Sequence, residues 1–388
     1  MAIDVQRLEV VRRWSAVMRG GGLQLGIATR DGQVLYLHAG ADAPWLLKLA
    51  LPAMTLSRIF LPGQGSPGAI ALSPDERTLY AALDRGVLAL VDTRQARVRK
   101  VLFFTERETV EEHWSTRHEG PGVPNGALVT PDGRALFVNI ETPIEGRNAT
   151  LWRVDLEREQ VAARIDLGKP SGGHGNLAMT PDGRLLYVAS LHDSTVWAVD
   201  ARADRIVQTW TDAVRPHGVF MRPDGQQLWV PNGGRREDGT GRSLWVLDPA
   251  RRVRLATLPA EDRPHWLDFT PDGRLVVVDA IFSDLITVID THTLKEVARV
   301  PVGNRAAGRP TPKDRPGAWH PKLSPDGRWV YVAVNYLDAV QVVDLDRRAV
   351  VKTIPVGPSP HQVHLFWPGA PYQAGWWTLR FPWVLAQE

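Results

Sequence analysis

A short motif, Ser/Thr-Pro-Asp-Gly-Arg or a close variant of it, recurs along this chain and constrains its fold more than any other feature. Proline presets the backbone φ angle and glycine accepts a positive φ, so Pro-Asp-Gly between two apolar runs predicts a tight turn. Six copies of the motif begin at Ser73, Thr130, Thr180, Arg222, Thr270 and Ser324. Each copy therefore predicts a β-hairpin.

Two further apolar runs follow the hairpins, and the first of them ends in an apolar residue and an aspartate, as at Asp200 and Asp344. Residues 297–302 and 350–356 are examples of the second run. Units of four strands that repeat about every 50 residues are typical of propeller blades. We therefore predict an all-β fold, a β-propeller of four-stranded blades that forms a single domain over residues 1–388.

Degenerate copies near both ends of the chain leave the number of blades open. Residues 29–37 resemble the motif with its second strand, and residues 360–367 resemble a further inner strand. With these two copies the inner strands number eight, so both seven and eight blades agree with the sequence. We expect residues 8–14 to pair with the C-terminal runs 376–381 and 383–386, because a ring closed by strands from both termini leaves no exposed sheet edge.

The composition excludes several classes of protein. None of the 388 residues is cysteine, which excludes disulfide scaffolds, zinc ribbons, iron–sulfur proteins and thiol nucleophiles. The net charge is only +3 and basic residues form no long block, so a nucleic-acid footprint is not evident. No apolar stretch approaches the roughly 20 residues of a membrane span, and the start lacks a signal-peptide pattern. We expect a cytoplasmic protein as written, or a periplasmic or extracellular one if an export signal was removed.

The strand and turn sequences also resemble a known family. Leu186-Tyr187-Val188-Ala189-Ser190, Val330-Tyr331-Val332-Ala333-Val334-Asn335 and the Pro-Asp-Gly-Arg turns resemble the YVTN-repeat propellers over about residues 24–366. Members of that family include haem-binding, copper-binding, hydrolytic and adhesive proteins. Pro360-His361 and Phe366-Trp367-Pro368-Gly369 are similar to the end of the haem domain of dissimilatory nitrite reductases. The two resemblances imply a propeller and add haem to the candidate cofactors.

Histidine recurs near one place in the repeat, the entry to the first strand of a blade. In a propeller this place faces the mouth of the central channel on every blade, so the pattern predicts a partial ring of imidazoles. Imidazole is the commonest metal ligand and suits zinc, copper and iron. The alternative is structural, with each imidazole bonding only main-chain groups between blades. The predicted metal ligands are His174, His217, His265, His320 and His361.

Other residues near the same strand ends complete the predicted site. Glu141 and Asp279 are carboxylates near the ends of second strands, where other blades carry amides, and they would bind a cation or act as a general base. Asn125 occupies the histidine position in the third blade, and Trp266 and Trp319 adjoin histidines, so these three are expected to contact a bound cofactor. The candidate catalytic residues are His217, His265, Glu141 and Asp279.

The predicted function follows from this histidine-rich face. We expect a metal- or haem-dependent site at the channel mouth that acts on a small molecule by redox chemistry or metal-assisted hydrolysis. Residues 304–319 carry four basic side chains, which would suit an anionic molecule or form a solvated loop. The alternatives are a non-catalytic binding or scaffold propeller and a metal-free, lactonase-like hydrolase. The cofactor stays open between copper, zinc or calcium held by nitrogen and oxygen ligands, a haem, and none.

Overall fold

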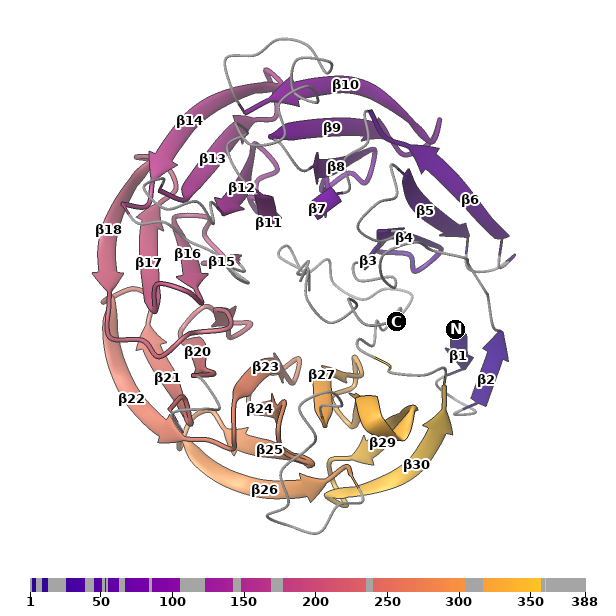
Figure 1. Ribbon diagram of the computed structural model, residues 1–388, viewed down its shortest axis with the longest axis vertical. Helices are drawn as coiled ribbons and strands as arrows, with labels where there is room; N and C mark the ends of the chain where they lie inside the picture. The colour runs from indigo at the N-terminus through magenta and orange to yellow at the C-terminus, as the bar shows by residue number, and fades with distance from the viewer. Residues whose placement is uncertain are drawn as a thin grey trace. The chain divides into compact units, whose positions relative to one another are not determined.

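Seven four-stranded antiparallel sheets, each made of consecutive strands, account for nearly all the regular structure (Figure 1). This computed structural model describes residues 2–4, 9–12, 26–38, 45–50, 53, 55–62, 67–83, 86–104, 123–141, 148–168, 177–234, 240–303, 317–356 and 360. These residues contain no α-helix, and none of their segments is a helix long and apolar enough to cross a membrane. The prediction of an all-β fold with four-stranded blades is confirmed.

The chain divides into two compact units, each described here by itself. Residues 18–213, with 366–388, contain four blades and are called the four-blade unit. Blade 1 is β3 (Gly26–Ala28), β4 (Val34–His38), β5 (Trp45–Ala50) and β6 (Thr55–Phe60), and blade 2 is β7 (Pro67–Leu72), β8 (Thr78–Leu83), β9 (Val87–Asp92) and β10 (Arg97–Phe103). Blade 3 is β11 (Val123–Val129), β12 (Ala135–Glu141), β13 (Thr150–Asp155) and β14 (Gln160–Asp166), and blade 4 is β15 (Leu177–Met179), β16 (Leu185–Ser190), β17 (Thr195–Asp200) and β18 (Arg205–Trp210).

Residues 214–365, with 1–17, contain the other three blades and are called the three-blade unit. Blade 5 is β19 (Phe220–Met221), β20 (Leu228–Asn232), β21 (Ser243–Asp248) and β22 (Val253–Pro259); blade 6 is β23 (Pro264–Phe269), β24 (Leu275–Ala280), β25 (Leu285–Asp290) and β26 (Lys295–Pro301); blade 7 is β27 (Ala318–Leu323), β28 (Trp329–Val334), β29 (Ala339–Asp344) and β30 (Ala349–Pro355). A short 3-10 helix, η1 (Asn335–Leu337), follows β28.

Two sequence predictions concern the ends of the chain, and the described residues cover the predicted segments only in part. The expected eighth inner strand lies outside the described residues except for Pro360, so the described blades number seven. In the segment expected to pair with the C-terminus, β2 (Glu9–Arg12) pairs with β1 (Ala2–Asp4). The C-terminal runs lie outside the described residues, so their pairing with this segment stays a prediction. Pairing with a neighbour in sequence costs little loop-closure entropy. A single domain over the whole chain stays a prediction.

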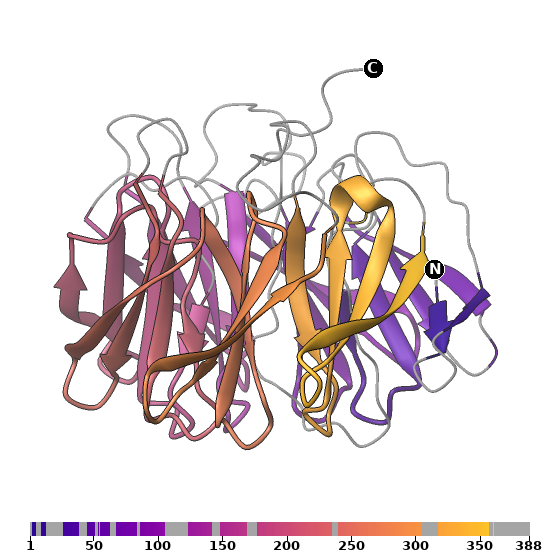
Figure 2. The same ribbon diagram turned by 90° about the horizontal axis from the view of Figure 1, so that it is seen from below.

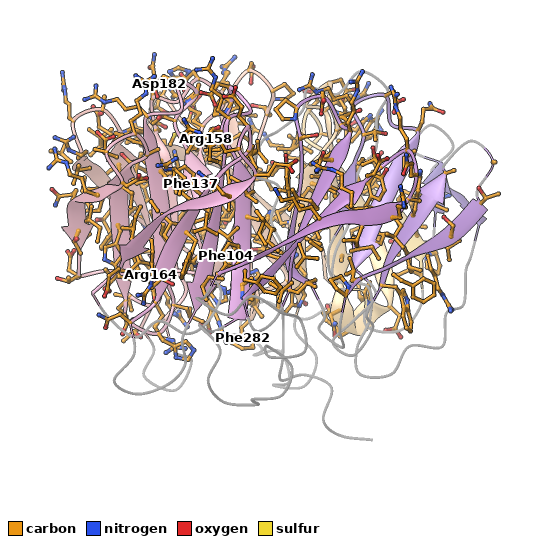
Figure 3. The ribbon with its side chains drawn as sticks, turned by 90° about the horizontal axis from the view of Figure 1, so that it is seen from above. Phe104, Phe137, Arg158, Arg164, Asp182 and Phe282 are labelled. Carbon is orange, nitrogen blue, oxygen red and sulfur yellow. The ribbon has the colours of Figure 1, made fainter. Side chains whose placement is uncertain are left out.

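The repeated motif forms the turn between the first and second strands of a blade. In blade 4 the Thr180 hydroxyl donates to Asp182 Oδ1 at 2.5 Å, the Leu185 N–H donates to Thr180 Oγ1 at 3.0 Å, and Gly183 has φ +68°. This hydroxyl hydrogen bond is the main cause of a lowered pKa at Asp182. Figure 3 shows Asp182 and Arg158 near one edge of the four-blade unit and Arg164 toward the other.

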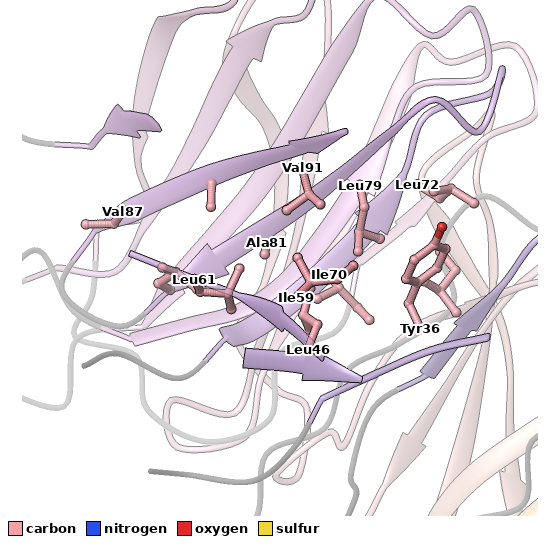
Figure 4. Packing of buried hydrophobic residues seen from close by; sticks show 13 residues of the cluster. Tyr36, Leu46, Ile59, Leu61, Ile70, Leu72, Leu79, Ala81, Val87 and Val91 are labelled. Atoms are coloured by element: carbon pink, nitrogen blue, oxygen red, sulfur yellow. The ribbon is translucent and has the colours of Figure 1, made fainter. Parts of the chain in front are cut away.

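The inner strands of each blade are covered on both faces, so apolar and polar residues do not simply alternate along them. Between blades 1 and 2, Leu46 and Ile59 pack with Leu79 and Val91, and all four are fully buried (Figure 4). Burial of such a side chain stabilises the fold by about 2 kcal/mol. The apolar faces therefore hold adjacent blades together within the unit.

The entry to the first strand lies at the edge opposite the repeated turns. In Figure 2 the tight turns of blades 6 and 7 lie along the lower edge, while η1 lies at the upper edge. Because η1 follows β28, which is antiparallel to β27, the start of β27 shares this upper edge. In blade 7 the predicted functional face is therefore the edge at which η1 lies.

Candidate functional site

Three of the five predicted histidines come together in the three-blade unit. His265 lies in β23, His320 lies in β27, and His217 lies shortly before β19. The strands β23 and β27 lie side by side (Figure 1). His174 and His361 lie outside the described residues.

The three imidazoles and two tryptophans form one cluster of contacting rings, called here the histidine–tryptophan cluster, in which only His265 and His320 are stacked. The ring centroids of His217 and His265 are 4.2 Å apart, and those of His265 and His320 are 4.9 Å apart with planes only 5° from parallel. The Trp266 ring lies 4.6 Å from that of His320, and the Trp319 ring lies 4.9 Å from that of His265. All five side chains are buried. Both tryptophans thus contact histidine rings, and their expected contact with a cofactor stays a prediction.

His320 reaches this cluster from a position one residue away from that of His217 and His265 in the repeat, within the one-residue range of the sequence alignment. His217 and His265 each precede their turn proline by six residues, whereas His320 precedes its turn proline by five, and Trp319 takes the shared position. His320 also has φ +44° although a proline follows it. A residue before proline favours extended backbone, and a left-handed non-glycine residue costs on the order of 1–3 kcal/mol.

Asp279 connects the main chains of two neighbouring inner strands. The Trp266 N–H in β23 donates to Asp279 Oδ1 at 2.6 Å, and the His320 N–H in β27 donates to Asp279 Oδ2 at 2.7 Å. Asp279 Oδ2 is also 3.9 Å from His265 Nδ1. Burial raises the pKa of Asp279 to about 7, against the opposing effect of these hydrogen bonds. Both oxygens thus accept main-chain donors, and a general-base role for Asp279 stays a prediction.

Electrostatics keep His265 uncharged. Burial is the main cause of a pKa well below the usual value for this imidazole, and the positive charge of Arg263 lowers it further. Arg263 and Arg215 each precede a proline-histidine pair and have φ +61° and +48°. A neutral imidazole has a free lone pair on one nitrogen and is the form that binds metals. The sequence analysis missed both arginines, although the repeated Arg-Pro-His was visible.

A buried lysine and an aspartate lie on the same two inner strands. Burial lowers the pKa of Lys322 to about 8 and raises that of Asp268, and each charge partly offsets the other shift. The Leu323 N–H donates to Asp268 Oδ2 at 3.0 Å, and Lys322 Nζ lies 5.4 Å from the ring centroid of Trp266. The sequence analysis did not single out this pair. The sequence feature that could have identified this pair was a lysine inside an apolar inner strand.

The remaining predicted site residues belong to the four-blade unit. Asn125 is buried on β11, and Glu141 is the last residue of β12. In that blade the two strands pair Val123 with Glu141. The described cluster is built without Asn125 and Glu141, and their roles stay predictions.

The described residues contain no group of three or more His, Asp or Glu side chains arranged to hold a metal ion. The orientation of the imidazoles gives a physical reason. A ligating lone pair lies in its ring plane, with the metal about 2 Å from the nitrogen. His265 and His320 are stacked in nearly parallel planes, so no single ion lies in both planes at once.

This chain resembles known proteins in sequence and in fold. No family model matches it. Protein NirF of Pseudomonas aeruginosa is 25% identical over 359 residues, which cover 88% of this chain and 80% of that protein. The structure of dihydro-heme d1 dehydrogenase NirN in complex with DHE matches with a TM-score of 0.68 and 18% identity, over 92% of this chain and 71% of that chain. The fold is a seven-bladed β-propeller.

A second solved structure supports the same fold. Kuenenia stuttgartiensis hydrazine synthase matches with a TM-score of 0.56 and 17% identity, over 86% of this chain and 99% of that chain. Identities this low establish the architecture alone. The resemblance to YVTN-repeat propellers stays a prediction, because no family model matches.

Proposed function

We propose that this protein binds a haem-type tetrapyrrole, related to dihydro-haem d1, at the histidine–tryptophan cluster. The observation that carries the proposal is the cluster of buried, closely spaced imidazoles and indoles in the three-blade unit. The likeness of 92% of this chain to a dihydro-heme d1 dehydrogenase solved in complex with DHE supports the ligand class.

The residues present fit such a group better than they fit a free metal ion. A haem iron would need only one of these imidazoles as a ligand, so the parallel rings of His265 and His320 present no conflict. The lowered pKa of His265 favours its neutral form, which is the form of imidazole that binds metals. When bound, the group supplies an iron centre whose axial ligand and surroundings set its redox properties.

The side chains of the cluster would each make a different contact with this ligand. One imidazole of His217, His265 or His320 would approach the iron, and the flat rings of Trp266 and Trp319 would pack against the macrocycle. Arg215 and Arg263, directly before the Pro-His pairs, would pair with carboxylate groups at the ligand's edge. The sequence prediction of a small, anionic ligand agrees with this assignment.

Titration of the purified protein with haemin, followed by visible absorption, tests the proposal. We expect a shifted Soret band at one haemin per chain, and at least tenfold weaker binding in His265→Ala and His320→Ala, which is about 1.4 kcal/mol. The matched control is His292→Ala, because His292 lies exposed in the turn after β25. Melting temperatures show whether each variant is folded. Absence of haemin binding, or equal binding by all variants, would refute the proposed site.

A further inference from the structure

The repeat position of Asp279 is unusual for a buried acid. Counted from the turn proline, four other blades carry an apolar residue at this place, and blade 3 carries Asn139. The four apolar residues are Ala82, Ala189, Pro231 and Ala333. A carboxylate at a position that alanine fills elsewhere loses its hydration for no gain in packing. Such a break in the repeat points to a role that the blade fold itself does not require.

The hydrogen bonds of Asp279 identify the main-chain groups on which it acts. A carboxylate offers two acceptor oxygens, whereas an amide offers one oxygen and a donor group. Asp279 uses one oxygen for the N–H of Trp266, the neighbour of His265, and the other for the N–H of His320. One side chain thus determines the main-chain positions beside two stacked histidines on different blades.

The backbone of His320 needs such a partner. Its φ of +44° directly before Pro321 is a disfavoured conformation, and disfavoured conformations persist only where surrounding contacts hold them. The 2.7 Å hydrogen bond from the His320 N–H to Asp279 is the contact that holds it. With this backbone, the His320 ring lies parallel to that of His265 at 4.9 Å.

We propose that Asp279 is a positioning residue, whose two oxygens set the spacing and parallel orientation of His265 and His320 and so present them to the ligand. The presentation to a tetrapyrrole rests on the proposed function. The positioning itself is a property of the ligand-free chain. Asp279 acts through main-chain groups and does not touch the ligand.

Two substitutions separate positioning from packing, and both imitate other blades of this chain. Asp279→Asn keeps the shape and one acceptor oxygen, as in blade 3, and Asp279→Ala removes both acceptors, as in blades 2, 4 and 7. We expect the alanine variant to release His320 from its parallel arrangement and the asparagine variant to restore it in part. Asn139→Ala is the matched control, because it changes the same repeat position in the four-blade unit.

The ligand-free test uses NMR of the protein labelled with 15N in its histidine rings. We expect Asp279→Ala to shift the ring signals of His265 and His320, Asp279→Asn to shift them less, and His292 to stay unchanged. Asn139→Ala should leave all three unchanged. If Asp279→Ala does not fold, the histidine ring signals of Asp279→Asn test the proposal. Unshifted His265 and His320 signals in a folded Asp279 variant would overturn the proposal.

The ligand test uses haemin with the same variants. We expect at least tenfold weaker binding, or a displaced Soret band, in Asp279→Ala, with partial recovery in Asp279→Asn and unchanged binding in Asn139→Ala. If the wild-type chain does not bind haemin, the proposed function fails, while the histidine signals still decide the positioning. Wild-type binding with no change in either Asp279 variant would overturn the positioning and leave the proposed function intact.

Discussion

At the scale of single residues, two kinds of aspartate show opposite pKa shifts in this fold. The turn aspartates Asp132, Asp182 and Asp272 accept a hydroxyl hydrogen bond, which is the main cause of their lowered pKa. Asp279 accepts two main-chain hydrogen bonds, yet its pKa is raised to about 7 because burial outweighs them. The balance between hydrogen bonding and loss of hydration thus decides the direction of each shift.

The raised pKa of Asp279 predicts a pH dependence of stability. The folded protein binds this proton more tightly than the unfolded chain, so the contribution is full below about pH 4 and is lost as the pH rises through about 7. The loss is at most about 4 kcal/mol. Urea unfolding between pH 5 and 8 should show the free energy of unfolding of Asp279→Asn falling less steeply than that of the wild type. Parallel curves for the two proteins would contradict this assignment.

At the scale of elements, the inner strands approach each other so closely that small residues are required. A Cβ atom added at Gly68 in β7 would lie 2.0 Å from the carbonyl oxygen of Pro124 in β11. Main-chain atoms have little freedom to move away. Gly68 stands at the repeat position that carries His217 and His265 in other blades, so this strand entry holds a close main-chain contact in one blade and a buried imidazole in two others.

Gly68→Ala should therefore destabilise the four-blade unit by about 3 kcal/mol, because the two inner strands must separate. Gly168→Ala is the comparison, since no atom lies within 4 Å of the added Cβ and only the φ of +76° opposes it. That strain costs about 1 kcal/mol. Denaturant unfolding of both variants measures the difference. Equal losses would show that the two inner strands accommodate the added methyl group at Gly68 and that the contact with Pro124 does not limit the position.

At the scale of the whole molecule, polar side chains join consecutive blades within each unit. Lys48 Nζ donates to the Thr93 carbonyl at 2.9 Å, between blades 1 and 2. The Arg153 guanidinium makes two hydrogen bonds of 2.7 Å to the Asp204 carboxylate, between blades 3 and 4. These contacts supplement the apolar faces and select one alignment of neighbouring blades.

A double-mutant cycle on Arg153 and Asp204 measures such a contact. We expect a coupling energy of about 1 kcal/mol from Arg153→Ala, Asp204→Ala and the double variant, because both side chains are about three-quarters buried and the pairing is bidentate. The coupling should decrease at high salt. A value near zero would mean that apolar packing alone aligns these two blades.

The sequence predicted the blades well because their signals are local. Proline, aspartate and glycine at adjacent positions determine each turn, and apolar runs on both sides determine the strands. The same reasoning located His217, His265, Trp266 and Trp319 near one strand entry. It also placed His320 within one residue of that position, but the positive φ of His320 before proline was not predicted from the sequence.

The sequence by itself determined the all-β fold, the four-stranded blades and the recurrence of histidine at strand entries. Only the tertiary structure decided which groups meet. Asp279 and His320 are 41 residues apart, and their hydrogen bond exists because packing places two blades side by side. Burial likewise lowers the pKa of His265 and of Lys322. Turn chemistry depends on neighbours in the chain, whereas hydration and ring orientation depend on neighbours in space.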